Sequence, residues 1–568
     1  MKRFIYTLLI LSISAASCQK DFLQRDTGVP ISQDDVFTDP VFASRFADNT
    51  YNFLINDYCR LAGTPNVFMG TTGEFADEAV FSGADPSVVT MNKGNYLDPA
   101  ATDVVVPYTQ MYQGIRNANT MLANIDIVPW TIEQNPALIK AQMLFLRGMF
   151  YFELIKRYGG VVLLDKPLSL TDETDLPRNT YEETLAFILN DIQAAEAILS
   201  TEAFNTIYSP STDWNAGNFG RITVGACKAL RSRLLLLDAS PLRNPTNDLT
   251  KWKAAADAAK EVIDMGRYDL QANYSTLLFV PTSPEYILIT VRPPRPLTNA
   301  ADHIMSPGSG GVSGKLNPTQ NHVDLYEVVQ RADPNNPASP IISSTPLVNG
   351  AAPGYDPQKP YDNRDPRFYA NILYNDAPWQ GRRMEMFEDG RDYRSTAVTY
   401  TRTRYYTRKL WPEALRAGST ATALLNFIQF RYGEVLLNYA EALNEAEGPV
   451  SDVYFYINKI RTRAGMPNLP ADLSQEQMRD RIHNERAVEL AFEEHRWWDV
   501  LRWKKGEEIN EVPVEGMNVV KTGSTFTYNR VTLEQLYQRV FVDRMYVYPI
   551  PQAEIIKSKG VLEQTPGW

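Results

Sequence analysis

Apolar residues recur at helical spacing along much of this chain, in paired segments that end at glycine. From 431 to 447 the apolar positions fall on one helical face, and Gly448 ends the pattern. A second amphipathic segment, from 453 to 463, follows at once and ends at Gly465. Two short helices joined by a tight turn cannot bury an apolar face alone, so such hairpins must stack around a shared core.

The same pattern occurs in the first half of the chain. The segment from 144 to 158 is apolar nearly all round, which predicts a deeply buried helix ending at Gly159. Thr180 and Glu183 form a capping box that opens the next helix. Two further pairs are predicted, 41–54 with 104–125 and 224–237 with 252–263. The predicted fold is mostly α, an irregular scaffold of helix hairpins similar to tetratricopeptide-type repeats.

The character of the sequence changes between 281 and 424. Seventeen of the 37 prolines lie there, and only 286 to 291 has the pattern of a strand. This composition predicts a loop-rich second lobe with very little β structure, and long irregular segments on a rigid scaffold usually carry function. The predicted organisation is a signal peptide (1–17), a lipidated tether (18–40), a helical region (41–280), a ligand-binding lobe (281–424) and a carboxy-terminal region of further hairpins with a cap (425–568).

The first residues have the layout of a bacterial lipoprotein signal. Lys2 and Arg3 precede an apolar stretch from 4 to 13, and small residues lead to Cys18. About ten apolar residues are too few to span a bilayer, which takes roughly 20. This layout predicts that the Cys18 thiol and the freed amine are acylated. One acyl chain alone anchors a protein only marginally, whereas several together anchor it stably. The alternative is an ordinary signal peptide cleaved near Ser17, with an incidental cysteine.

Charge and motif content exclude several classes of protein. The net charge of -11 argues against binding to nucleic acid. The glycine-rich run 310–315 fails as a phosphate-binding loop because Leu316 replaces the Ser or Thr that holds magnesium. The four histidines show no metal-ligand spacing, so no metal site is predicted. No cofactor and no enzymatic activity are predicted either. A pair of carboxylates of the glycoside-hydrolase kind stays a weaker alternative, since 67 acidic residues are present. Cys227 lies in an apolar helical pattern that predicts a buried thiol, and a pairing with Cys59 is left open.

The segment from 482 to 503 combines charges with tryptophans. One helical face is shared by Leu490, Glu493, Trp497 and Val500. A single helix is therefore predicted, and it also contains His483 and His495. Its acids and arginines are interpreted as i,i+3 ion pairs that fix the helix in place, Arg486 with Glu489 and Glu493 with Arg496.

Several segments resemble hallmark sequences of the SusD/RagB family. They include RYGEVLLNYAEALNEA, INKIRTRAGMP, IHNERAVELAFEEHRWWDVLRW and the terminal VYPIPQAEIIKSKGVLEQTPGW. Earlier segments such as YQGIRNANTMLANI and FLRGMFYFELIKRYGG also match, and all run in the family's order from about residue 20 onward. The start CQKDFL fits the same family.

The resemblance implies a function that helix patterns alone do not. Members of the family act as a hinged lid on a SusC-like, TonB-dependent transporter at the cell surface, anchored in the outer membrane by lipid. They bind an oligosaccharide or polysaccharide and perform no covalent chemistry. A peptide-binding lid of the RagB type, with the same architecture, is the alternative.

Sugar rings present apolar C–H faces and polar rims, so aromatic side chains and hydrogen-bonding groups bind them. The resemblance places binding loops after the first long helix and after the predicted strand, and further aromatic residues lie in loops. The candidate ligand-binding residues are Asp77, Glu78, Phe81, Asn95, Tyr96, Trp214, Arg292, Asn299, His303, Tyr361 and Trp379. For Tyr361 and Trp379 the alternative interpretation is packing within the loops.

Overall fold

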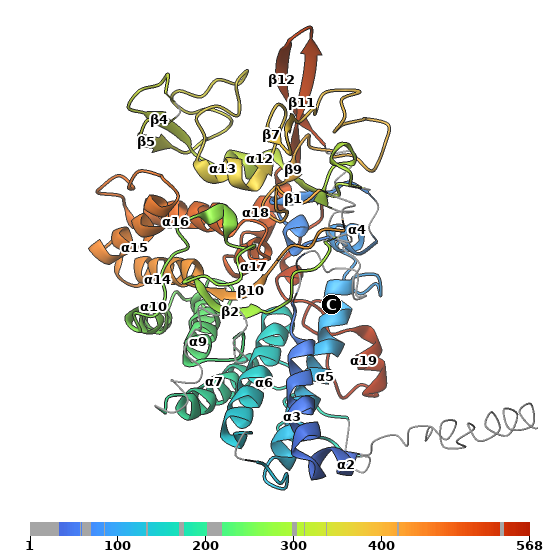
Figure 1. Ribbon diagram of the computed structural model, residues 1–568. Helices are drawn as coiled ribbons and strands as arrows, with labels where there is room; N and C mark the ends of the chain where they lie inside the picture. Colours follow the sequence, from blue (N-terminus) through green and yellow to red (C-terminus); the bar gives the residue numbers. More distant parts are fainter. Residues whose placement is uncertain are drawn as a thin grey trace, which may run out of the picture.

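Antiparallel helices form the lower half of the molecule (Figure 1). The computed structural model describes residues 33–56, 58, 70–83, 86–131, 134–169, 175–201, 219–297, 304–311, 313–336, 338–416, 420–533 and 539–568. The scaffold helices are α2 (Gln33–Thr38), α3 (Pro40–Asn49), α5 (Thr102–Asn124), α6 (Pro136–Tyr158), α7 (Tyr181–Leu199), α9 (Val224–Ala239), α10 (Leu249–Asp264), α14 (Tyr432–Glu447), α15 (Ser451–Arg463), α16 (Gln475–Glu489), α17 (Arg496–Arg502), α18 (Gly506–Glu511) and α19 (Gln552–Lys557). Successive helices pack as pairs, α5 on α6, α6 on α7, α9 on α10 and α14 on α15.

Helix α6 is the central element of this scaffold. Asn135 caps its first turn, and Gly159 ends it with a positive φ of 72°. Nearly every residue between these ends is buried, as predicted from its all-round apolar pattern. The ring of Phe150 packs directly on α5, where Gly114 leaves the space because a Cβ there would lie 2.6 Å from the ring. No helix in the described part of the chain is both long and apolar enough to cross a bilayer.

The predicted helix pairs are confirmed in α3 with α5, in α9 with α10, and in α14 with α15. The capping box of Thr180 and Glu183 opens α7 as predicted. The chain is mostly helical, which confirms the predicted fold class. The likeness to tetratricopeptide-type hairpins in particular stays a prediction.

The prediction of one helix through 482–503 is wrong. Helix α16 ends at Glu489, and α17 begins only at Arg496, so His483 and His495 lie in different elements. Phe492 and Glu494 adopt left-handed backbone conformations, with φ of 61° and 64°. Such angles are unfavourable for residues with a Cβ and persist where tertiary contacts hold them. Here the Phe492 N–H donates to Glu78 Oε1 at 2.9 Å.

The strands are short and pair two by two, all antiparallel. The pairs are β1 (Ala79–Phe81) with β3 (Leu316–Pro318), β2 (Tyr286–Thr290) with β10 (Phe427–Arg431), β4 (Val328–Arg331) with β5 (Ile341–Thr345), β6 (Ile372–Leu373) with β9 (Tyr406–Thr407), β7 (Pro378–Trp379) with β8 (Arg382–Arg383), and β11 (Glu515–Thr522) with β12 (Thr525–Thr532). Strand β2 confirms the prediction at 286–291, whereas the other strands of that region were not predicted.

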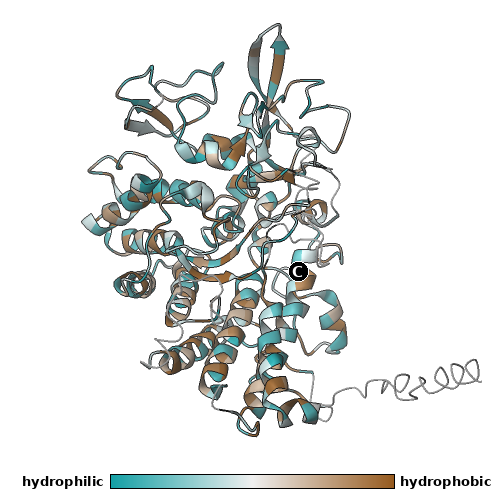
Figure 2. Ribbon diagram, viewed as in Figure 1, coloured by the Kyte–Doolittle hydropathy of each residue, from teal (hydrophilic) through white to brown (hydrophobic). Residues whose placement is uncertain are grey.

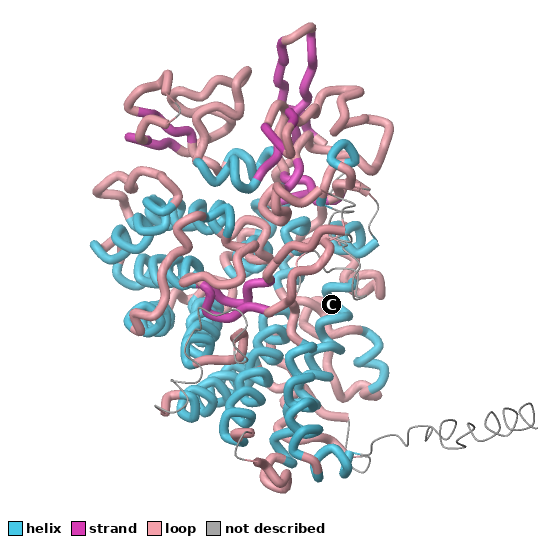
Figure 3. Tube along the Cα trace, viewed as in Figure 1, coloured by secondary structure: helices cyan, strands magenta, loops and turns pink. Residues whose placement is uncertain are grey.

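Loops, strands and short helices form the upper lobe (Figure 3). The short helices and 3-10 turns of the chain are α4 (Pro86–Asn92), α12 (Gln320–Asp324), α13 (Pro366–Asn371), η2 (Thr50–Phe53), η3 (Thr72–Phe75), η4 (Tyr274–Thr276), η5 (Pro307–Ser309) and η6 (Asp543–Tyr546). The upper lobe draws on more than 281–424, because β1 pairs with β3 and the β11–β12 hairpin stands at its top (Figure 1).

The carboxy-terminal segment returns to the first long helices. The Tyr548 N–H donates to the Arg157 carbonyl at 2.7 Å, and the Tyr548 hydroxyl donates to Asp103 Oδ2 at 3.0 Å. The last residue, Trp568, stacks on Tyr96 with ring centroids 5.3 Å apart. The end of the chain therefore closes one side of the scaffold.

Two large apolar cores and one small cluster of Val329, Ala464 and Met466 lie in the described structure. Hydropathy coloured on the ribbon shows apolar stretches along the helices (Figure 2). The larger core belongs to the scaffold and includes residues from Phe37 to Leu562. The second lies under the loops of the upper lobe and includes Tyr361 and Trp379. The loops thus rest on a core of their own.

Candidate ligand-binding regions and a cavity in the scaffold

Asp77, Glu78 and Phe81 lie together at β1 but point into the protein. Asp77 pairs with Arg496, with Oδ1 and Nε 2.7 Å apart. Burial opposes ionisation of Asp77, but the Arg496 guanidinium outweighs it and lowers the pKa of that carboxyl to about 2. Burial has the opposite outcome at Glu78, where it raises the pKa to about 8. The Phe81 ring is buried.

The remaining described candidates fall in separate neighbourhoods. Asn95 is exposed, whereas its neighbour Tyr96 is buried against Trp568. Tyr361 packs on Tyr374 with ring centroids 4.5 Å apart, as the alternative of packing within the loops predicts.

The Trp379 side chain is 1% exposed and lies in the same upper-lobe core as Tyr361, so neither ring offers an open face. Arg292 is half-buried and donates to the Asn56 carbonyl at 2.6 Å. Trp214, Asn299, His303 and Cys18, with the signal segment 1–17, lie outside the described residues. Ligand contact by these candidates stays a prediction.

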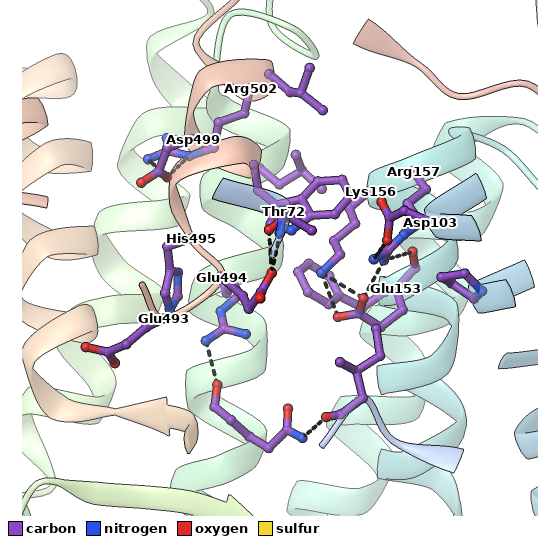
Figure 4. Close-up of a pocket in the computed structure, with 18 of the residues that line it drawn as sticks. Thr72, Asp103, Glu153, Lys156, Arg157, Glu493, Glu494, His495, Asp499 and Arg502 are labelled. Atoms are coloured by element: carbon purple, nitrogen blue, oxygen red, sulfur yellow. Dashed lines mark hydrogen bonds and ion pairs between the residues drawn. The ribbon is translucent and has the colours of Figure 1, made fainter. Parts of the chain in front are cut away.

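A cavity of about 150 Å³ lies where α5, α6, α9, α14 and α17 face one another (Figure 4). Its apolar wall includes Phe152, Leu237 and Phe427. Its polar wall includes Lys156 from α6 and His495 from the turn before α17. No local sequence signal points to this cavity, because its walls come from elements hundreds of residues apart in the chain.

The charged groups around the cavity are paired with one another. Lys156 Nζ lies 2.7 Å from Glu153 Oε2, and Arg157 lies 3.0 Å from Asp103 Oδ1. On other walls Arg233 pairs with Glu434 at 2.6 Å. Figure 4 shows the ion pairs of Glu153 and Asp103 on the α6 side, away from Asp499 and Arg502. The cavity therefore holds little uncompensated charge.

Burial dominates the titration of the two basic groups at the cavity. It lowers the pKa of Lys156 to about 8, a shift that Glu153 opposes and Arg157 reinforces. Burial also lowers the pKa of His495 to about 4, so its imidazole is neutral at physiological pH. Carboxylate Glu494 Oε2 accepts hydrogen bonds from the N–H of Thr72 at 3.0 Å and from its hydroxyl at 2.5 Å.

A network of buried ion pairs joins the scaffold to the upper lobe. Arg431 of β10 donates to Glu285 Oε1 at 2.6 Å, to Glu489 Oε1 at 2.8 Å and to Glu493 Oε2 at 2.8 Å. Lys409, from the upper lobe, donates to Glu493 Oε1 at 2.6 Å. All five side chains are nearly inaccessible to solvent.

The network also corrects the predicted i,i+3 pairs. Arg486 pairs with Asp499 at 3.0 Å rather than with Glu489, and Arg496 pairs with Asp77 rather than with Glu493. The helix break between α16 and α17 redirects these side chains to partners on other elements. The burial and pairing of these charges agree with their interpretation as structural ion pairs. Separately, no group of His, Cys, Asp or Glu in the described residues could hold a metal ion.

Comparisons with known proteins agree over most of the chain. Residues 289–568 match the family described as "SusD family", and residues 70–223 match "Starch-binding associating with outer membrane". SusD-like protein P2 of Formosa agariphila is 23% identical over the whole length of both chains, and SusD-like protein P25 of the same organism is 23% identical over 88% of this chain and 89% of its own.

Solved structures have the same fold. A SusD-like protein from Bacteroides fragilis superposes with a TM-score of 0.75 at 26% identity, covering 95% of this chain and 99% of its own. A SusD-like carbohydrate binding protein from the same species gives 0.72 at 22% identity, over 93% and 99%. With two family regions matched in order and the fold shared over nearly its full length, the chain is a member of the SusD/RagB family.

Proposed function

We propose that this protein is a glycan-binding lipoprotein of the bacterial cell surface. It is held in the outer membrane by acylated Cys18 and acts as the lid of a SusC-like, TonB-dependent transporter during nutrient uptake. It binds an oligosaccharide or polysaccharide reversibly and catalyses no reaction. The ligand face is the loop-rich lobe, and the helical scaffold faces the transporter.

The observation that carries this proposal is family membership over both halves of the chain. One matched family is described as starch-binding and associated with the outer membrane, and one solved neighbour is named as carbohydrate-binding. The architecture supports the same function, because a lobe of loops stands on a rigid helical base (Figure 3). Loops on a rigid base are the usual place for binding residues.

Two of the described candidates suit direct contact with a sugar. Asn95 is exposed and Arg292 is half-buried, and both carry groups that hydrogen-bond to hydroxyls. Asn299 and His303 remain in the proposal on the strength of the family resemblance, and Trp214 remains as an aromatic residue of a predicted loop. Asp77, Glu78, Phe81, Tyr96, Tyr361 and Trp379 act mainly by shaping the loops, since they are largely or fully buried.

Affinity gel electrophoresis against a panel of polysaccharides tests the proposal, with peptides screened in parallel by calorimetry. At least one polysaccharide is expected to retard the wild-type chain. Arg292→Ala is expected to weaken that retardation, and Arg116→Ala, at an exposed position on α5, serves as its matched control. Retention by peptides alone would favour the peptide-binding lid. Release of reducing sugar with many turnovers would contradict a purely binding role and favour a glycoside hydrolase.

The anchor and the partner need separate experiments. Labelling with palmitate is expected to modify the wild-type chain and to fail in Cys18→Ala. Labelling of Cys18→Ala would refute the anchor. Copurification of a TonB-dependent barrel with the detergent-extracted wild-type chain is expected, and its consistent absence would refute the lid.

A further inference from the structure

We propose that the cavity in the helical scaffold is a second binding site, which accepts a single neutral polyol ring of monosaccharide size. The site lies among α5, α6, α9 and α17, apart from the loops of the upper lobe. It does not depend on the glycan-binding proposal, because it is built from other residues. Its size, its charge balance and its open hydrogen-bonding groups each limit the ligand.

The size of the cavity sets the size of the ligand. A cavity of roughly 150 Å³ in another protein holds a benzene ring, so the space here admits one six-membered ring and excludes a chain of several. Most of the lining surface is apolar, with Phe152, Leu237 and Phe427 among the residues. Ligand sites typically combine such walls with a few polar groups that fix orientation.

The charges around the cavity argue for a neutral ligand. Glu153 balances Lys156, and Glu434 balances Arg233. A carboxylate would compete with Glu153 or Glu434 for its cation, and an amine would compete with Lys156 or Arg233 for its carboxylate, in ion pairs of only 2.7 and 2.6 Å. Ions are costly to bury without a partner of their own, so the walls select against them.

The open hydrogen-bonding capacity argues for hydroxyl groups. Neither ring nitrogen of His495 has a hydrogen-bond partner among the described residues, so the neutral ring offers one donor and one acceptor. Lys156 donates to the Glu153 carboxylate and lies over the rings of Trp498 and Phe152, with Nζ 4.5 and 5.5 Å from the ring centroids. A hydroxyl both donates and accepts, so a ring that carries several hydroxyls matches this wall, whereas benzene does not.

The helix break contributes to the site. Glu494 and His495 both reach the cavity from the turn between α16 and α17, where Phe492 and Glu494 have positive φ. Unfavourable backbone angles in residues other than glycine concentrate at binding and catalytic sites. The turn thus supplies part of the polar wall of the cavity.

Calorimetric titration of the detergent-extracted full chain tests the proposal with D-glucose, D-galactose, D-xylose and myo-inositol. Acetate and methylammonium represent charged ligands, and benzene represents an apolar ring. Saturable binding of at least one polyol at one site per chain is expected, with none for the two ions. Binding of benzene alone, of the ions, or of nothing would overturn the proposal.

Two variants locate the binding in the cavity. Leu237→Trp fills the space and is expected to weaken polyol binding at least tenfold, whereas Leu249→Trp, on the exposed side of α10, is its matched control. His495→Ala removes one hydrogen-bonding partner without filling space and is expected to weaken binding about threefold to tenfold. If Leu237→Trp does not fold, His495→Ala still tests whether the ligand binds in the cavity. Unchanged polyol binding in either folded variant would refute the assignment of the site to the cavity. Retardation of the wild-type chain by polysaccharide is scored separately, because it tests the glycan-binding proposal instead.

Discussion

Replacing Arg431 by methionine should destabilise the whole protein. Methionine keeps much of the side-chain volume but removes hydrogen bonds to Glu285, Glu489 and Glu493. The side chains of these three acids are at most 3% exposed, so water cannot replace the lost cation. Removing one partner of a buried ion pair typically costs about 3–5 kcal/mol, and the upper part of that range is expected because three carboxylates share this arginine.

Other cations in the network limit the loss. Arg463 also lies near Glu285 and Glu489, and Lys409 pairs with Glu493. The expected decrease in the free energy of unfolding is therefore about 4 kcal/mol rather than the sum of three broken pairs. Adding Glu285→Gln to the Arg431→Met variant should recover part of this loss, because without Arg431 the single Arg463 is shared between Glu285 and Glu489.

Urea denaturation followed by circular dichroism and by tryptophan fluorescence measures the effect. The two signals must change together for a single free energy to be meaningful. Arg383→Met is the matched control, because Arg383 is exposed and its pair with Asp376 spans 3.9 Å, so a change below about 1 kcal/mol is expected. A loss below 1 kcal/mol in Arg431→Met would refute the reasoning that this network holds the two lobes together.

Further predictions concern single side chains. The pKa of Glu78 is raised from 4.5 to about 8, so the free energy of unfolding should fall as pH rises between these values. In urea titrations Glu78→Gln should be more stable than the wild type by up to about 4 kcal/mol near pH 7.5 and should match it near pH 4.5. The pH dependence for Asp77 has the opposite sign, because its pKa is lowered from 3.8 to about 2. Asp77→Asn should lower the free energy of unfolding by about 2 kcal/mol at pH 7, and its difference from the wild type should vanish as pH falls through 2. Equal pH profiles for both variants would contradict these assignments. Thr180→Ala should lower the free energy of unfolding by about 1 kcal/mol while Thr180→Ser changes it little, and equal losses would argue against the capping box. The buried Cys227 thiol, whose pKa burial raises, should react with a disulfide reagent only after unfolding in a Cys59→Ser background; rapid labelling of the native protein would contradict its burial.

Local pattern was sufficient to predict most of the scaffold. Helix α6 is apolar on all sides, and α7 opens with a capping box, so both are specified by their own residues. The break after Glu489 was not predictable in this way, because Leu490 and Trp497 fit a continuous helical face. Contacts with Glu78 and Arg431, far away in sequence, hold the turn instead.

Strands were harder to predict because most are only two to five residues long. The β11–β12 hairpin is the exception, since its strands are rich in Val, Thr and aromatic residues and flank Gly523, which has a positive φ of 61°. That signal could have been recognised. The cavity could not, because periodicity says nothing about which helices face one another.

The return of Tyr548 to Asp103 and Arg157 has a consequence for how the chain acquires its structure. A growing polypeptide emerges from its amino terminus, so α5 and α6 exist long before the partner that covers them. Contacts between residues so distant in sequence form slowly. Until the last 30 residues arrive, apolar surface on these helices is open to chaperones or to aggregation. Truncations near 540 should therefore accumulate as insoluble protein even though every long helix is present.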